Sequence, residues 1–105
     1  MNDSQYNLIA DELLIAVEDA VENLDDYIDY ETAGGMIELI FKDGSKIIIN
    51  KQEPLHQIWV ATKFNGHHFE LKDEKWIDKR GAGEFWQFLT DAATKQAGIA
   101  VDLNH

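Results

Sequence analysis

Hydrophobic residues in the first quarter of the chain recur at spacings of three and four, the period of a helix. This pattern predicts an amphipathic helix over residues 4–24, with Asp3 or Ser4 as its N-cap. A side-chain oxygen at the cap would accept a backbone N–H that the first helical turn leaves without a partner. The apolar face is expected to hold Tyr6, Ile9, Leu13, Ala16, Val17, Ala20, Val21 and Leu24.

From residue 27 onward the hydrophobic period changes to two, which is typical of half-buried strands. We expect six strands, over residues 27–32, 36–41, 46–50, 57–64 and 67–72 and around Trp76-Ile77. In the first strand Ile28 and Tyr30 would face one side of the sheet, and Asp29 and Glu31 the other. The sheet should therefore have one apolar face.

Glycine-containing dipeptides separate several of these strands. Asp43-Gly44 and Asn65-Gly66 each predict a two-residue hairpin of type I′, because both central positions of that turn need a positive φ. A second helix is expected over residues 84–97, with Gly98 as its left-handed stop and residues 99–105 as a tail that docks or frays. Its inward face should hold Phe85, Leu89, Ala92, Ala93 and Gln96.

This order of elements, helix, six antiparallel strands, helix, predicts an α+β fold. Both helices would cover one face of a single sheet in a two-layer α/β sandwich, forming a single domain over residues 1–105. Of the residues, 45% are hydrophobic, which is enough for a core despite the charge. The chain has no cysteine, no secretory signal and no apolar run of membrane-spanning length, so we expect a cytoplasmic protein that does not enter a membrane.

Charge is distributed very unevenly along the chain. Residues 1–41 contain eleven acids and no Lys or Arg, so the whole net charge of −11 arises there. Such acidity argues against nucleic acid and anionic lipid as partners, since both are polyanions. It favours metal ions or a basic patch on another protein.

The helical acids are phased against the apolar face. Two neighbouring stripes lie opposite the core, one of Asp11, Glu18, Glu22 and Asp25, the other of Glu12, Asp19 and Asp26. Several of them crowd the helix C-terminus, where the macrodipole is negative and like charges repel one another. Tolerance of that cost suggests a site. The alternative is an ordinary solvated helix face.

Carboxylates are hard oxygen ligands suited to iron, Mg²⁺, Ca²⁺ and Mn²⁺. Because the cluster contains neither Cys nor His, a closed tetrahedral site is excluded, and we expect weak, exposed binding of several ions. The candidate ligands are Asp11, Glu18, Asp19, Glu22, Asp25, Asp26, Asp29 and Glu31.

An enzyme is not expected. The chain has none of the common nucleophile, phosphate-loop or zinc-protease motifs, and its acids point to solvent. His67 and His68 should point to opposite faces of their strand and are interpreted as surface histidines. Trp59 falls on the polar side of its strand, either exposed as a binding hot spot or covered by a neighbouring Lys or Gln stem.

Residues 50–61, Asn-Lys-Gln-Glu-Pro-Leu-His-Gln-Ile-Trp-Val-Ala, strongly resemble the frataxin family. Residues 44–49 and 83–86 resemble its bacterial, CyaY-type branch, and the resemblance extends from Met1 to about Gly98. It implies an iron-binding protein that regulates iron–sulfur cluster assembly by contacting the cysteine desulfurase and its scaffold protein. In bacterial members this contact resembles an iron-dependent brake.

The resemblance also implies which residues act. The family's acidic ridge maps to Glu18, Asp19, Glu22, Asp25, Asp26, Asp29 and Glu31, of which Glu18, Asp19 and Glu22 are expected to contact the partner. Sheet-face contacts map to Asn50, Gln57 and Trp59, with Trp59 exposed.

Two alternatives stay open at this point. One is an iron store or ferroxidase that oligomerises with iron, although without iron we expect a monomer in any case. The other is a polyanion mimic that occupies a nucleic-acid site on a basic protein.

Overall fold

The computed structural model describes residues 1–103. The elements, in chain order, are α1 (Asp3–Glu22), β1 (Ile28–Ala33), β2 (Met36–Phe41), β3 (Lys46–Gln52), a short 3-10 helix η1 (Glu53–Leu55), β4 (Gln57–Ala61), β5 (Gly66–Lys72), β6 (Lys75–Asp78) and α2 (Phe85–Ala97). Neither helix of the described chain is long and apolar enough to cross a membrane.

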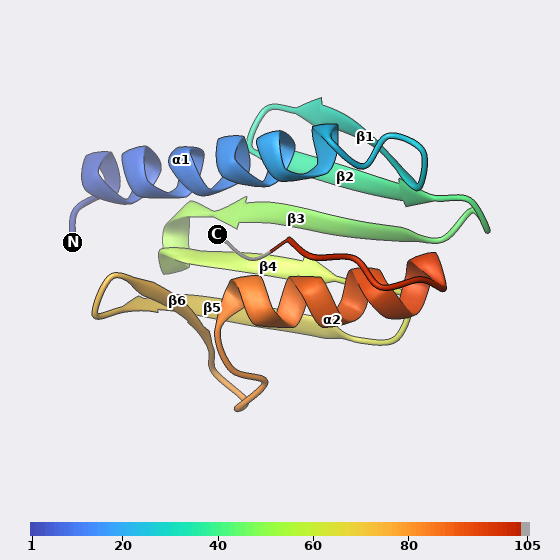
Figure 1. The fold of residues 1–105 in the computed structure, drawn as a ribbon. Coiled ribbons are helices and arrows are strands. Elements are labelled where there is room, and N and C mark those ends of the chain that lie inside the picture. The colour runs from blue at the N-terminus through green and yellow to red at the C-terminus, as the bar shows by residue number, and fades with distance from the viewer. Residues whose placement is uncertain (104–105) are drawn as a thin grey trace.

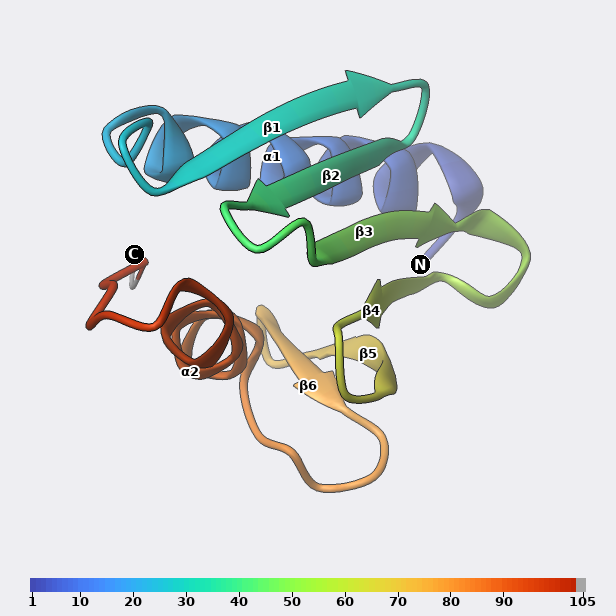
Figure 2. The ribbon, with the colours of Figure 1, turned by 90° about the vertical axis from the view of Figure 1, so that its right-hand side faces the viewer.

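The strands form one sheet in the order β1-β2-β3-β4-β5-β6, each antiparallel to its neighbours. Both helices lie on the same face, α1 along β1 and β2 and α2 beside β6 (Figures 1 and 2). The predicted α+β sandwich is confirmed. Since strands follow each other as hairpins, β1 becomes an edge strand directly beneath α1.

The core lies between the helices and the sheet. On α2, the buried residues are the five predicted, Phe85, Leu89, Ala92, Ala93 and Gln96. On α1, they are Tyr6, Ala10, Leu13, Val17 and Val21. Ala10 was not predicted, and Ile9, Ala16, Ala20 and Leu24 are only partly buried. The stripe that α1 buries is therefore narrower than its apolar content suggests.

The N-terminus of α1 lies one residue earlier than the sequence pattern predicted. Asn2 is the N-cap, and its side chain accepts a hydrogen bond of 2.8 Å from the Gln5 backbone N–H. The Gln5 side chain accepts a hydrogen bond of 3.0 Å from the Asn2 backbone N–H, completing a capping box. Asp3 and Ser4 were the wrong candidates because this reciprocal pair satisfies two backbone donors at once.

Both predicted type I′ turns are wrong. Between β2 and β3 the loop spans residues 42–45, and its Asp43 carboxylate accepts from the backbone N–H and hydroxyl of Ser45. Between β4 and β5, the Thr62 hydroxyl accepts from the backbone N–H groups of Phe64 and Asn65. Side-chain acceptors thus stabilise longer loops at both places.

Two-residue turns join β1 to β2, through Gly34 and Gly35, and β5 to β6, without glycine. Asp73 and Glu74, between β5 and β6, have φ values of 48° and 68°. Lys72 pairs directly with Lys75 on either side of them. Asp tolerates this left-handed conformation better than most residues, whereas Glu has no such preference.

The tail after α2 docks onto the core. Val101 and Leu103 are buried, and Leu103 donates its backbone N–H to the Thr90 hydroxyl at 3.0 Å. Figure 1 shows the tail running back along α2 on the side of α1. His105 lies outside the described residues.

Candidate functional site

Eight acids lie along α1, the turn after it and the edge strand β1. We call this set the acidic ridge; it comprises Asp11, Glu18, Asp19, Glu22, Asp25, Asp26, Asp29 and Glu31. All are exposed except Glu18, which is half-buried. The structure therefore brings the predicted carboxylates onto one border of the molecule, where the helix and the sheet edge meet.

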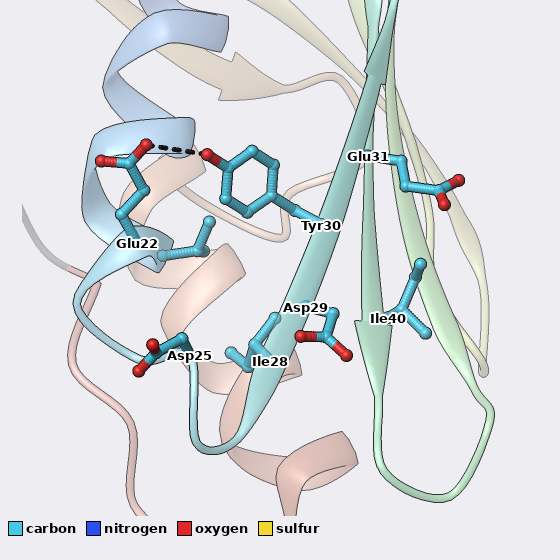
Figure 3. Close-up of a pocket in the computed structure, with 8 residues that line it drawn as sticks. Glu22, Asp25, Ile28, Asp29, Tyr30, Glu31 and Ile40 are labelled. Carbon is cyan, nitrogen blue, oxygen red and sulfur yellow. Dashed lines mark hydrogen bonds between the residues drawn. The ribbon is translucent and has the colours of Figure 1, made fainter.

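The ridge wraps around β1 at the end of α1. Glu22 and Asp25 lie on the helix side of β1, whereas Asp29 and Glu31 point away from the helix (Figure 3). This confirms the predicted alternation of the acids with Ile28 and Tyr30 in β1. A surface cavity of about 510 Å³ is lined by all four of these acids together with Tyr30. Its carboxylates can therefore meet a cation from both sides of the edge strand.

Tyr30 is a member of this site that the sequence did not single out. Its hydroxyl donates a hydrogen bond of 2.8 Å to Oε1 of Glu22 (Figure 3). That bond to a carboxylate raises the pKa of Tyr30 to about 12, because ionisation would place two negative charges together. The sequence could have indicated this contact, because Tyr30 comes two residues after Ile28 and so lies on the strand face beneath the helix.

Few cations neutralise the ridge from within. Among the described residues, Asp11 is the one ridge acid that forms an ion pair, with Lys51 Nζ at 2.7 Å. No group of three or more acids or histidines converges closely enough in the described chain to enclose a metal ion. The donor set thus suits exposed hard cations held by one or two carboxylates, and not a closed site.

The predicted sheet-face residues lie on the open side of the sheet, away from the helices. Asn50, Trp59 and His68 are opposite one another on β3, β4 and β5. The Trp59 ring stacks on His68 with centroids 4.4 Å apart, and its Nε1–H donates to Gln57 Oε1 at 2.7 Å. Trp59 is therefore half-buried and not fully exposed as predicted, and its cover is a histidine ring.

Gln57 itself is only 4% exposed. Besides accepting from the indole, its amide lies 3.3 Å from Oε2 of Glu70. Gln57, which was expected to contact a partner at the surface, is thus buried and holds Trp59 in place. Asn50 and Trp59 offer the accessible part of this face.

His56, His67 and His68 lie apart from the ridge. His67 and His68 point to opposite faces of β5 as predicted, but His67 is half-buried. Its ring packs on Phe88 with centroids 4.5 Å apart, and its Nδ1 lies 3.3 Å from Oδ2 of Asp78. His56 stacks on Tyr6, and its Nε2 lies 2.7 Å from Oδ1 of Asp3.

Asp78 ends β6 and is buried. Its Oδ2 accepts from the Ala82 backbone N–H at 2.9 Å, which closes the 78–83 loop. Burial raises the pKa of Asp78, but hydrogen bonds from Ala82, His67 and the Arg80 backbone together outweigh burial and lower it. This group anchors the entry to α2 and lies away from the ridge.

The fold and the sequence both match a known family. The family model described as a frataxin-like domain matches residues 1–99. The chain belongs to the frataxin family. The sequence resemblance is thereby confirmed.

Two relatives are named iron–sulfur cluster assembly protein CyaY. The one from Colwellia psychrerythraea is 60% identical over 104 residues, covering 99% of this chain and 98% of the relative. The one from Pseudoalteromonas atlantica is 59% identical over 101 residues, covering 96% of this chain and 94% of the relative. The frataxin relatives thus match over nearly their full lengths.

Solved frataxins share the fold. The structure from Psychromonas ingrahamii has a TM-score of 0.91 and 42% identity, and the match covers the whole of both chains. A trimeric frataxin from Saccharomyces cerevisiae, described as complexed with ferrous iron, has a TM-score of 0.76 and 29% identity, covering 86% of each chain.

Proposed function

We propose that this chain is an iron-binding regulator of iron–sulfur cluster assembly, acting in the cytoplasm and without an enzymatic reaction of its own. It docks its acidic ridge on a basic patch of the cysteine desulfurase that supplies sulfur to the scaffold protein. The observation that carries this proposal is the row of ridge carboxylates along α1 and β1, of which one alone has an internal cation among the described residues.

The electrostatics of the ridge favour a basic protein. Exposed like charges on one border create a field that steers a partner of opposite charge and speeds association. Because these carboxylates stay hydrated in the free protein, docking should weaken steeply as salt screens them. Glu18, Asp19 and Glu22 lie together on α1 and are the proposed contacts.

Iron is the proposed metal ligand of the same ridge. Pairs of carboxylates one helical turn apart, such as Glu18 with Glu22, supply hard oxygen ligands. These ligands can bind Fe²⁺, Fe³⁺ and other hard divalent cations. The yeast frataxin described as complexed with ferrous iron supports this choice of metal. Weak binding at several positions follows from the open geometry.

The open sheet face supplies a second contact. Asn50 and Trp59 lie opposite each other, beside a surface hollow of about 200 Å³ that is also lined by His68. A half-buried Trp whose orientation is fixed by Gln57 loses little freedom on binding, which is the usual property of a hot spot.

The proposal is tested by NMR shift mapping, first with Fe²⁺ and then with the purified desulfurase. Fe²⁺ should broaden amide signals on α1 and β1 and spare α2. The desulfurase should affect the same ridge signals and those around Trp59. Broadening confined to α2 or the 78–83 loop would contradict the metal part, and an unperturbed ridge with desulfurase present would contradict the docking part.

A second candidate function is an iron store or ferroxidase, and the observation behind it is that a yeast frataxin is described as trimeric. An oxidation site needs inward carboxylates and histidines around a metal pair. No such group converges in residues 1–103. We therefore expect a monomer without iron and no catalytic oxygen consumption, measured by size-exclusion chromatography and an oxygen electrode. Turnover of Fe²⁺ within stable assemblies would favour the store.

A further inference from the structure

A groove lies between α1 and the β1–β2 hairpin, with a volume of about 310 Å³. Its apolar lining includes Leu14, Ile15, Met36 and Ile37, and its charged lining is Asp11 and Glu18. The groove is therefore not simply part of an acidic surface. It combines a hydrocarbon floor with two carboxylates.

Ile15 is the most unusual residue of this groove. Its side chain is 59% exposed, and its neighbours one helical turn away are all acidic, namely Asp11, Glu12, Glu18 and Asp19. Leu8, one heptad earlier, is 63% exposed but does not line the groove. Glu18 forms no ion pair with any described residue. The groove thus offers uncovered apolar surface beside an uncompensated charge.

Lys51 already makes, within the chain, the kind of contact that a basic side chain could make in this groove. The Lys51 stem passes over Gly35, and its Nζ reaches Oδ1 of Asp11 at 2.7 Å, leaving the Lys51 side chain 16% exposed. Its hydrocarbon is covered while its charge meets a carboxylate of α1. Oδ2 of Asp11 remains as a second acceptor for another donor.

We propose that this groove receives an arginine side chain from the basic protein partner, so that the inference rests on the proposed function. The aliphatic stem would lie on Ile15 and Met36, and the guanidinium would lie between Asp11 and Glu18. A hydrated metal ion gains nothing from an apolar floor, whereas an arginine covers it and keeps its charge paired. The flat, forked guanidinium also matches two carboxylates better than an ammonium does.

The test compares Ile15→Ser with Leu8→Ser, its matched control, for affinity to the purified cysteine desulfurase. Both side chains are exposed, so both variants should fold, as checked by circular dichroism and urea unfolding. Ile15→Ser should weaken binding about fivefold at low and at high salt, because apolar contact is not screened. Leu8→Ser should change it less than about twofold. Glu18→Gln should weaken binding mainly at low salt.

A second probe separates failure of this inference from failure of the proposed function. It is a short peptide of alternating arginine and leucine, compared with the same peptide carrying citrulline, which has the shape of arginine without its charge. Methyl signals of Ile15 and Met36 should shift with the arginine peptide alone. That shift supports the groove even if the desulfurase does not bind. Equal responses to the two peptides would overturn the arginine proposal, and so would equal desulfurase affinity of Ile15→Ser and wild type. Methyl shifts that depend only on protein concentration would also overturn it, because they would show that a second copy of the chain fills the groove.

Discussion

Tyr30 and Glu22 connect the two elements that carry the ridge. The hydroxyl of the strand residue donates to the carboxylate at the last turn of the helix, in the part of α1 where negative charge is least favoured. The bond fixes the Glu22 carboxylate above the edge strand. Tyr30 therefore organises the ridge without adding charge to it.

This contact predicts a tyrosine titration. Glu22→Gln should lower the pKa of Tyr30 from about 12 toward its ordinary value of 10.0, because the carboxylate charge that opposes ionisation is removed. In the wild type the contact stabilises the fold fully below pH 10 and is lost as pH rises through the folded pKa. Ultraviolet absorbance of the phenolate measures the titration, with Tyr30→Phe to assign it. An unchanged Tyr30 transition in Glu22→Gln would contradict the assignment.

The lowered pKa of Asp78 leads us to expect a loss of folding stability at acid pH. Its folded pKa lies below the ordinary 3.8, so its contribution is present above that pH and is lost as pH falls through the folded value. Asp78→Ala should cost about 2 kcal/mol at neutral pH, because it removes the hydrogen bonds that a buried carboxylate accepts from the Ala82 backbone N–H and shares with His67. Urea unfolding across pH measures this, with the exposed Asp91→Ala as control. Equal stability of the two variants would show that the 78–83 loop has another anchor.

For single residues, the sequence predicted which face of the sheet a side chain occupies better than it predicted which side chains surround it. The alternation in β4 correctly put Trp59 on the open face. It could not reveal that His68 stacks on Trp59 or that Gln57 receives its N–H, because both depend on strand register. The partial burial of His67 was missed for the same reason, since Phe88 and Asp78 come from elements later in the chain.

The element that positions the ridge is α1, and Tyr6 fixes its N-terminal end. The buried Tyr6 hydroxyl donates to the Gln57 carbonyl at 2.6 Å and accepts from the Gln52 N–H at 2.9 Å. Those two groups flank η1, between β3 and β4. One side chain thus ties the helix to the centre of the sheet.

Tyr6→Phe should therefore destabilise the protein by about 2 kcal/mol, since it leaves a backbone carbonyl and a backbone N–H without partners. Denaturant unfolding should show a lower midpoint with an unchanged slope. Tyr27→Phe is the matched control, because Tyr27 is exposed. If both variants unfolded at the same midpoint, the hydroxyl of Tyr6 would not be the anchor.

Periodicity predicted both α-helices and all six strands of the described chain, because burial on one face of the sheet imposes a period on each of them. The dipeptide signals failed at two of the turns, where Thr62 and Asp43 supply side-chain acceptors that lengthen the loops. Dipeptide preferences describe isolated hairpins, whereas here the sheet register decides where each strand stops.

For the whole molecule, concentrating eight of its twenty acids on one border has a cost in stability. The ridge is the part of the fold where repulsion should be relieved by any cation. Its position was predictable from sequence because charge and helical phase are both read directly. The groove beside it was not, since it needs β1 and β2 placed against α1.

Neutralising Asp19, Asp25 and Asp26 together to Asn should raise the Tm by about 5 °C at low salt. The difference from wild type should shrink as salt increases, because screening already relieves the repulsion. Divalent cations should stabilise the wild type more than this variant. Calorimetry measures each effect, with Asp91→Asn as a charge change elsewhere. No gain in Tm from neutralisation or from divalent cations would count against a cooperating cluster.

The central claim is that the ridge itself is the docking face. It is tested most directly by reversing Glu18, Asp19 and Glu22 to Lys together and measuring affinity for the purified cysteine desulfurase by calorimetry, with circular dichroism to confirm folding. Binding should be lost while the fold persists, and wild-type affinity should fall steeply with salt. A folded triple variant that binds with wild-type affinity would contradict it.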